Sequence, residues 1–203
     1  MSSKPQSLPT SASLILRIQH GDQTAWTRVE ALYRPLLRYW CDRQNVANND
    51  ADDIIQDVFV AVNRYIADFT AHGDKVCFRP WLKTITRRKI VDFYRRNIKD
   101  NPVLLTESAW ERRQPIVEAE ESLSDAEMEI ERETEKQILY RQIFEQIKSE
   151  VNANTWEAFL LTTLGGEDSV SVAAKLGMTP ANVRKAKSNV TKRIKNEFGN
   201  LIQ

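Results

Sequence analysis

Residues 169–190 read SVSVAAKLGMTPANVRKAKSNV, and this stretch decides the fold of the C-terminal part of the chain. Its first half predicts a short helix that ends at Gly177, since glycine readily takes the left-handed conformation found after a helix. Thr179 is a helix-capping residue and Pro180 suits a first helical position, so a second helix is expected directly after the turn. Two helices joined in this way form a helix-turn-helix, a motif whose second helix enters the major groove of DNA by its N-terminal end.

Apolar residues at helical spacing predict how these two helices pack against each other. The expected buried positions are Val172, Ala173, Leu176, Val183, Ala186, Val190 and Ile194. Met178 is an apolar turn residue that can fill the space between the helices. The small side chains of Ala173 and Ala174 are expected to let the helices cross closely.

Charge in this region favours a nucleic-acid partner. Residues 175–195 hold seven basic residues and no acidic one (Lys175, Arg184, Lys185, Lys187, Lys192, Arg193 and Lys195). The candidate DNA contacts on the side away from the apolar stripe are Thr179, Asn182, Arg184, Lys185, Ser188 and Lys192. The alternative is a solvated basic helix of an ordinary helical bundle.

The N-terminal half also has helical periodicity. Residues 13–45 predict two helices with a break at Gly21, where Asp22 is a candidate N-cap. The polar run 48–53 offers capping residues for an amphipathic helix whose expected buried stripe is Ile54, Ile55, Val58, Phe59, Val62, Ile66 and Phe69. A loop is expected around Gly73, and a further helix from about Pro80 to about Asn97.

This last helix lies in a second basic segment. Residues 79–99 contain eight basic residues and one acidic residue, with aromatic residues interleaved: Arg79, Lys83, Arg87, Arg88, Lys89, Arg95, Arg96 and Lys99 against Asp92. Cations with aromatic rings suit a nucleic-acid strand whose bases stack or flip out. For Trp81 and Phe93 we favour the plainer interpretation that they are core residues with cations around them.

The composition as a whole predicts an all-α protein with two small domains. The 203 residues include only 6 glycines and show almost no strand-like alternation. Residues 107–135 hold eleven acidic and three basic residues, which indicates an extended acidic linker whose last part merges into the next helix. We therefore expect a disordered tail at 1–12, a first domain at 13–98, a linker at 99–136 and a second domain at 137–203.

Several classes of protein are not expected. Cys41 and Cys77 lie far apart and have no nearby histidine pair, so we expect neither a zinc site nor a disulfide, and a cytoplasmic location fits. The N-terminus lacks the apolar core of a signal peptide, and no apolar run reaches the roughly 18 residues that span a membrane. There is no phosphate-binding glycine loop and no nucleophile–base pair, so we expect no enzyme, no catalytic residue, no cofactor and no small-molecule substrate.

Two further stretches carry a resemblance to a known family. Residues 50–62, DADDIIQDVFVAV, and residues 78–96, FRPWLKTITRRKIVDFYRR, resemble conserved region 2 of the sigma-70 family. The C-terminal helix-turn-helix is similar to region 4 of that family. With no folded domain between the two regions, the chain resembles the extracytoplasmic-function group of alternative sigma factors.

The resemblance implies partners and roles for individual residues. It implies that Asp53, Gln56 and Asp57 bind core RNA polymerase at the clamp helices of its β′ subunit, and that region 4 lies at the β flap and the promoter −35 element. It implies that the loop 70–78 takes a flipped base of the −10 element. The residues implied at the −10 element are Trp81, Lys83, Arg87, Arg88, Arg95 and Arg96. An anti-sigma factor is a further implied partner.

Rival interpretations remain open at this point. A helix-turn-helix regulator that is not a polymerase subunit would explain the C-terminal domain, but not the carboxylate helix or the basic-aromatic segment. A sigma-like scaffold would bind polymerase without selecting promoters. An N-terminal cap explains Asp50 and Asp52 better than it explains Gln56, and a calcium loop is disfavoured because its sixth position would be Ile55 rather than glycine.

Overall fold

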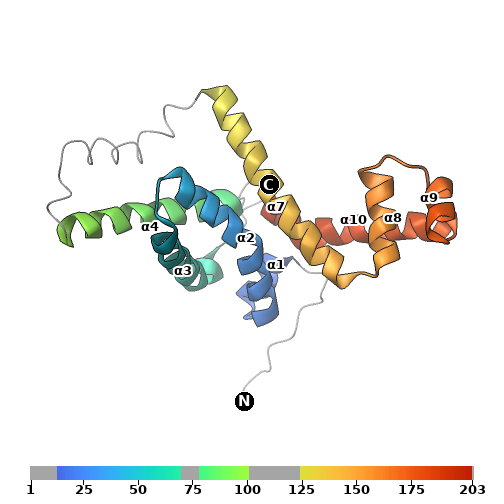
Figure 1. The fold of residues 1–203 in the computed structure, drawn as a ribbon. Helices are drawn as coiled ribbons and strands as arrows, with labels where there is room; N and C mark the ends of the chain where they lie inside the picture. The colour runs from blue at the N-terminus through green and yellow to red at the C-terminus, as the bar shows by residue number, and fades with distance from the viewer. Residues whose placement is uncertain (1–12, 70–77, 101–123, 203) are drawn as a thin grey trace, which may run out of the picture. The chain divides into compact units, whose positions relative to one another are not determined.

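The structure is a computed structural model that describes residues 13–69, 78–100 and 124–202 (Figure 1). Its elements are α1 (Leu14–Gln19), α2 (Gln23–Arg43), α3 (Asn48–Tyr65), the short 3-10 helix η1 (Ile66–Asp68), α4 (Phe78–Asp100), α7 (Asp125–Glu150), α8 (Ala153–Thr163), α9 (Ser169–Leu176) and α10 (Pro180–Ile202). Within these residues every regular element is helical, which confirms the predicted all-α class. The predicted N-terminal tail and the loop around Gly73 lie outside the described residues, as does most of the acidic linker.

The chain divides into two compact units. The first unit contains residues 13–29 and 140–202, and the second contains residues 30–100 and 124–139 as far as they are described. The predicted domain boundaries at 98 and 137 stay a prediction, because compactness does not say which part binds which partner.

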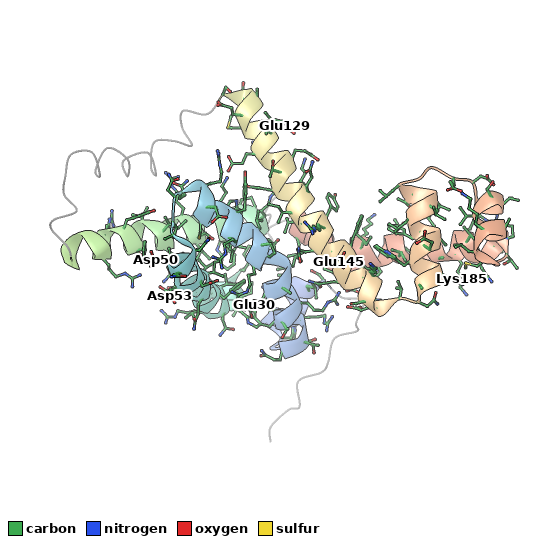
Figure 2. The ribbon with its side chains drawn as sticks, in the orientation of Figure 1. Glu30, Asp50, Asp53, Glu129, Glu145 and Lys185 are labelled. Atoms are coloured by element: carbon green, nitrogen blue, oxygen red, sulfur yellow. The ribbon has the colours of Figure 1, made fainter. Side chains whose placement is uncertain are left out.

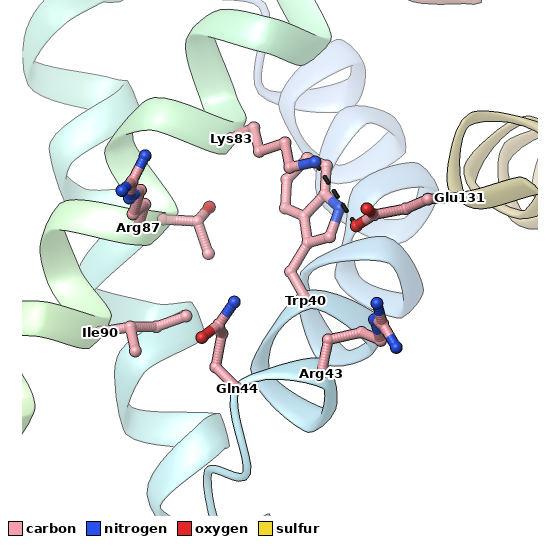
Figure 3. A pocket seen from close by; sticks show the side chains of 8 residues that line it. Trp40, Arg43, Gln44, Lys83, Arg87, Ile90 and Glu131 are labelled. Carbon is pink, nitrogen blue, oxygen red and sulfur yellow. Dashed lines mark ion pairs between the residues drawn. The ribbon is translucent and has the colours of Figure 1, made fainter. Parts of the chain in front are cut away.

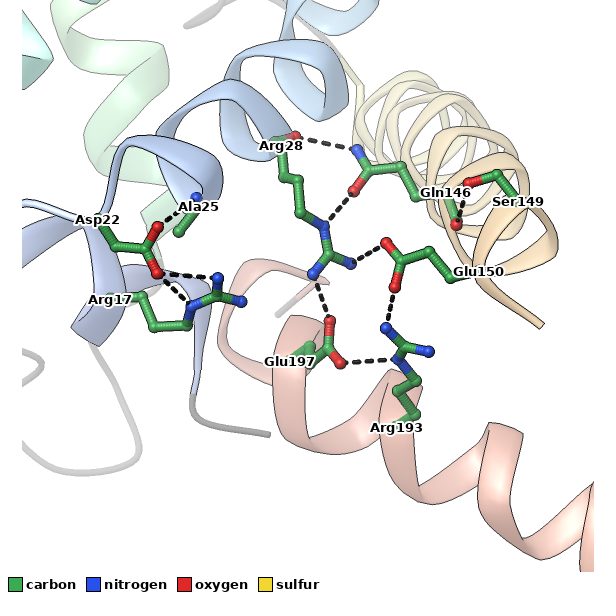
Figure 4. A network of polar contacts seen from close by, with 9 residues as sticks. All are labelled: Arg17, Asp22, Ala25, Arg28, Gln146, Ser149, Glu150, Arg193 and Glu197. Carbon is green, nitrogen blue, oxygen red and sulfur yellow. Dashed lines mark hydrogen bonds and ion pairs between the residues drawn. The ribbon is translucent and has the colours of Figure 1, made fainter. Parts of the chain in front are cut away.

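In the first unit α10 packs against α8 and α9, and α1 lies against α10. A polar network joins the start of α2 to the end of α7 and to α10 (Figure 4). Its centre is Arg28, whose Nη1 lies 2.7 Å from Oε2 of Glu197, and whose guanidinium lies over the ring of Phe198. Glu197 is only 2% exposed and lies in the interior of the unit, whereas Arg193 and Glu150 of the same network reach its surface.

In the second unit α3 packs against α4. All seven residues of the predicted stripe are buried: Ile54, Ile55, Val58, Phe59, Val62, Ile66 and Phe69. The helix is shorter than predicted, because α3 ends at Tyr65 and the last two of these residues lie in η1 and directly after it. Phe78 at the start of α4 is fully enclosed beside Tyr33 of α2, with ring centroids 5.1 Å apart. The hydroxyl of Tyr94 donates to the carbonyl of Gln44 at 2.9 Å, which ties the later part of α4 to the turn after α2.

One of the two helix caps predicted in the N-terminal half agrees with the structure and the other does not. The break at Gly21 is confirmed, with a φ of 77°, and Asp22 accepts from the backbone N–H groups of Thr24 and Ala25. The expected cap of α3 is wrong, because Ala47 occupies the N-cap without a side-chain hydrogen bond and the polar run lies inside the helix.

Two other boundaries move relative to expectation. Helix α4 begins at Phe78 rather than near Pro80, since a proline is tolerated throughout a first turn whose N–H groups have no helical partner. Helix α7 begins at Asp125, inside the segment predicted as linker. Ser124 caps it together with Glu127, whose carboxylate accepts from the Ser124 backbone N–H at 2.9 Å. This capping box was visible in the sequence as Ser-x-x-Glu.

Candidate nucleic-acid interface

Helix α9 has Asp168 as its N-cap, which was not predicted from the sequence. Oδ1 of Asp168 accepts from the backbone N–H groups of Val170 at 2.8 Å and Ser171 at 3.1 Å. Hydrogen bonds from the Ser171 side chain, then from the Ser171 and Val170 backbone, lower the pKa of Asp168 below its ordinary value. The signal that could have found this cap is an aspartate directly before the apolar run.

The turn of the helix-turn-helix is built as predicted. Gly177 ends α9 in the left-handed conformation, with a φ of 63°. The Thr179 hydroxyl accepts from the backbone N–H of Asn182 at 3.2 Å, and Pro180 is the first residue of α10. The local sequence therefore sets the angle at which α10 leaves the turn.

A small apolar cluster holds the two helices together. It contains Ala158 of α8, Val172 and Ala173 of α9, and Val183 and Ala186 of α10, with Leu161, Leu176 and Met178 packed against it. The prediction for Ala174 is wrong, because this residue is exposed and only Ala173 lies at the crossing. Leu176 and Ile194, both predicted to be buried, are half-buried.

The six residues predicted to contact the −35 element all belong to one exposed set. Thr179, Asn182, Arg184, Lys185, Ser188 and Lys192 are exposed, at and after the start of α10 (Figure 2 labels Lys185). Arg184 also donates from Nη1 to the Ser169 hydroxyl at 3.2 Å, which directs its guanidinium along the start of α9. Donors of this kind, on the first turns of such a helix, suit base edges in the major groove.

Other basic residues of this region are engaged within their own unit. Nζ of Lys175 lies 2.7 Å from Glu167, and Lys187 donates to the carbonyl of Thr162 at 3.1 Å. Arg193 donates from Nε to Glu197 at 2.8 Å. The seven positive charges counted in the sequence are therefore not all available for phosphate.

The basic helix α4 presents its predicted residues on two different sides. Trp81 and Arg88 line an open hollow of about 480 Å³ with the end of α3 and η1, where Tyr65 and Phe69 also lie. Lys83 and Arg87 line a second, smaller hollow with α2 and α7. Positions two residues apart in an α-helix are rotated by about 200° around its axis, so Trp81 and Lys83 point to opposite sides of α4.

Trp81 belongs to an aromatic cluster. Its ring centroid lies 4.9 Å from that of Phe69 and 5.5 Å from that of Phe78. Trp81 is half-buried, so it is packed on one side and reaches the hollow on the other. Phe93 is half-buried too, and its ring meets that of Tyr94 edge to face.

Lys83 is held by carboxylates of α7. Its Nζ lies 3.5 Å from Glu131 and 3.3 Å from Glu135 (Figure 3 shows the former pair). Arg95 and Arg96 lie farther along α4 and are both exposed, and Nη2 of Arg96 is 3.6 Å from Asp57. The residues predicted at the −10 element thus differ in how far their own unit already compensates their charge.

The three residues predicted to bind polymerase differ in how exposed they are. Asp53 and Gln56 are exposed on α3 (Figure 2 labels Asp53). Asp57 is half-buried and faces α4, where Arg96 and Lys89 lie within 4.0 Å of its carboxylate. A change of charge at Asp57 would therefore disturb contacts within the unit, which the spacing in the sequence did not reveal.

Within the described residues, no three histidine, cysteine, aspartate or glutamate side chains gather as metal ligands would. None of the helices that the structure describes is long and apolar enough to cross a membrane.

Comparison with known proteins identifies the family. Residues 31–99, which contain α3 and α4, match the model for sigma-70 region 2. The chain is 28% identical over 176 residues to the ferric citrate uptake sigma factor FecI of Escherichia coli (strain K12), covering 87% of this chain and 86% of that protein. The chain belongs to the sigma-70 family. It is also 35% identical over 83 residues to the RNA polymerase sigma factor NccH of Alcaligenes xylosoxydans xylosoxydans, covering 41% of this chain and 43% of that protein.

Within the sigma-70 family the chain is of the extracytoplasmic-function type, and it is an alternative sigma factor that directs transcription initiation. The predicted family and function are thereby confirmed, and the rival interpretation as a helix-turn-helix regulator is not favoured. The roles of individual residues stay proposals.

Proposed function

We propose that this sigma factor acts through three surfaces, which bind core RNA polymerase, the −10 element and the −35 element. The observation that carries the proposal is that one segment, residues 31–99, matches sigma-70 region 2 and holds both the exposed polar face of α3 and the cations of α4. The helix-turn-helix of α9 and α10 lies in the other unit and supplies a second DNA-binding surface. We propose domains at 13–98 and 137–203 from the resemblance of these segments to regions 2 and 4 of the family.

The polymerase-binding surface is the exposed face of α3. Asp53 and Gln56 lie there with nothing of their own unit over them, and Asp57 contributes beside them through the part of its carboxylate that faces solvent. We assign this surface to the β′ clamp helices and the helix-turn-helix unit to the β flap, as in the family that the chain resembles.

The −10 surface is the hollow between α3, η1 and α4. Its volume, about 480 Å³, lies within the range of about 300 to 1,000 Å³ found for sites that take small molecules. Trp81 offers a ring on which a base can stack, and Arg88 offers a charge for the phosphate beside it. Arg95 and Arg96 extend the positive charge along α4 toward the neighbouring phosphates. Lys83 and Arg87 add positive charge on the other side of the same helix.

The −35 surface is the exposed start of α10. Arg184 and Lys185 can donate to guanine, and Asn182 can pair with adenine. Thr179, Ser188 and Lys192 lie on the same exposed stretch and suit backbone contacts. We propose a binding role in the cytoplasm rather than a catalytic one, and an anti-sigma factor as a further partner.

The experiment that tests this function is reconstituted transcription. Purified chain and core polymerase are given a promoter mapped by genome-wide start-site analysis, and run-off product is measured. Arg184→Ala and Lys185→Ala are each expected to reduce the product about 5- to 100-fold, since a good base contact contributes about 1 to 3 kcal/mol. Lys195→Ala removes an exposed cation farther along the same helix and is expected to have little effect.

Two outcomes would contradict the proposal. A chain that binds DNA tightly alone but produces no promoter-dependent transcript with core polymerase is not a sigma factor. A normal transcript level from the two substituted chains would remove the assignment of α10 to the −35 element.

A further inference from the structure

The first half of α7 lies against the basic side of α4 within the second unit. This half belongs to the acidic segment of the sequence, and the side it covers carries Lys83, a residue assigned above to the −10 element. The inference that follows rests on that proposed function.

Glu135 is the centre of this contact. It is only 3% exposed, and its Oε1 accepts from the indole N–H of Trp40 at 2.8 Å. Nζ of Lys83 lies 3.3 Å from the same oxygen, and Nη1 of Arg79 lies 3.6 Å from Oε2. Arg79 Nη1 is itself buried and makes no hydrogen bond, so this carboxylate is the anion that compensates it.

Glu131 lies one turn earlier and adds a second carboxylate. It is 3.5 Å from Nζ of Lys83 and closes the edge of the small hollow between α2, α4 and α7 (Figure 3). The lining of that hollow includes three cations, Arg43, Lys83 and Arg87, and Glu131 is the one carboxylate among its lining residues. The hollow is therefore a positively charged recess with an anion at its edge.

The neighbouring carboxylates of α7 make no such contact. Glu129 pairs with Arg132 three residues on, and Glu133 pairs with Lys136 in the same way. The side chains of both glutamates are more than half exposed, at 65% and 57%. Glu131 and Glu135 are four residues apart and share one face, which explains why these two and not their neighbours meet α4.

A phosphate that pairs with Lys83 would need the space beside its ammonium group that Glu131 and Glu135 occupy. An ammonium with two carboxylates within 3.5 Å already has its charge compensated, so a phosphate gains little by approaching it until they leave. Replacing the carboxylates by a phosphate exchanges one anion for another on the same cations and breaks no covalent bond.

We propose that the first half of α7 is an internal cover that masks Lys83 and Arg79 from nucleic acid in the free chain. Contact of single-stranded DNA with this side of α4 requires residues 125–139 to move away, whereas the hollow at Trp81 and Arg88 on the opposite side stays open. The sigma factor is thereby kept from binding single-stranded nucleic acid tightly when it is not seated on its promoter.

The test is the binding of a fluorescein-labelled single-stranded DNA oligonucleotide of mixed sequence to the full chain without polymerase. The variant Glu131→Gln/Glu135→Gln removes the two masking charges and keeps side-chain size and an acceptor for Trp40. The matched control Glu129→Gln/Glu133→Gln removes the same charge from the same helix. Anisotropy is measured over a range of salt concentrations.

The masking variant is expected to bind about fivefold more tightly than the unsubstituted chain, because the partly exposed Lys83 loses both of its charged partners. The slope of log K for DNA binding against log salt concentration should become steeper by about 1.4. This is about 0.7 for each of the two cations, Lys83 and Arg79, that become available to a single strand. The control should follow the unsubstituted chain. Equal tightening in both variants would mean a general effect of net charge and would overturn the proposal, as would no tightening in a masking variant of unchanged helical content.

A second measurement does not depend on the variants and decides the matter if the masking variant fails to fold. Hydrogen exchange of the unsubstituted chain, at saturating oligonucleotide, is expected to speed up in residues 125–139. Unchanged or slower exchange there overturns the proposal. Failure of the proposed function is separate, because it would appear as absent run-off transcription with core polymerase, whereas both measurements here use the free chain.

Discussion

Loss of the Glu197 charge is expected to destabilise the first unit more than any other single change of charge in its polar network (Figure 4). Glu197 is 2% exposed, its Oε2 lies 2.7 Å from Arg28, and its Oε1 accepts from Arg193 at 2.8 Å. Glu197→Gln keeps the volume and removes the charge. Two guanidinium groups are then left near a neutral amide in the interior.

The magnitude follows from what remains around Arg28. Removing one partner of a buried ion pair costs about 3 to 5 kcal/mol when nothing else compensates the other. Here Glu150 stays 3.3 Å from Arg28, and the Gln146 side chain still accepts from it at 3.2 Å. We therefore expect a loss of about 2 to 3 kcal/mol in the free energy of unfolding, and a fall in Tm of about 5 to 10 °C for a protein of this size.

The assay is urea denaturation followed by circular dichroism, with Glu150→Gln as the control. Glu150 pairs with the same two arginines, Arg28 and Arg193, but its side chain is 31% exposed, so its loss should cost less than about 1 kcal/mol. If Glu197→Gln unfolds within about 0.5 kcal/mol of the unsubstituted chain, or if Glu150→Gln costs as much, the reasoning from burial is refuted.

Three further outcomes are expected. Asp53→Lys should weaken binding to core polymerase about tenfold, because an exposed charge is reversed at the proposed interface; equal affinity of both chains in a titration would count against this surface. Asp168→Ala should lower the Tm at neutral pH. Because the pKa of Asp168 is lowered in the folded chain, the difference in Tm between the two chains should shrink as the pH falls from about 4 toward 2. Thermal scans at several pH values measure this difference. Burial raises the pKa of the Cys41 thiol to about 11. In a Cys77→Ser variant, iodoacetamide at neutral pH should therefore modify Cys41 only as fast as the chain unfolds. Rapid modification of the native chain would show that the thiol is accessible.

Much of the fold could be predicted from the sequence because its signals are local. The spacing of Ile54, Val58 and Val62 predicts which side of α3 is buried, since the helical period alone decides which residues share a face. The turn at Gly177 and Thr179 is predicted because both residues act on backbone groups within three positions of themselves. The same locality explains why the capping box at Ser124 was visible although it was overlooked.

The exposure of the −35 residues was predictable for the same reason. Asn182, Lys185 and Ser188 lie off the apolar stripe of α10, and a helix that buries one face must expose the other. The family resemblance of residues 50–62 and 78–96 was likewise present in the order of residues, and the comparison with known proteins confirmed it.

Which charges are available for a partner was decided only by the tertiary structure. Lys83 and Arg88 look equivalent in the sequence, yet Lys83 is held by carboxylates some fifty residues along the chain while Arg88 lines an open hollow. Asp53 and Asp57 look equivalent too, yet only Asp57 faces the cations of α4. Periodicity says that a residue lies on a polar face, but an ion pair depends on which distant segment packs there. The sequence by itself therefore determined the helices, their buried stripes and the family, whereas the packing of α7 and α4 decided which of the basic residues are already paired.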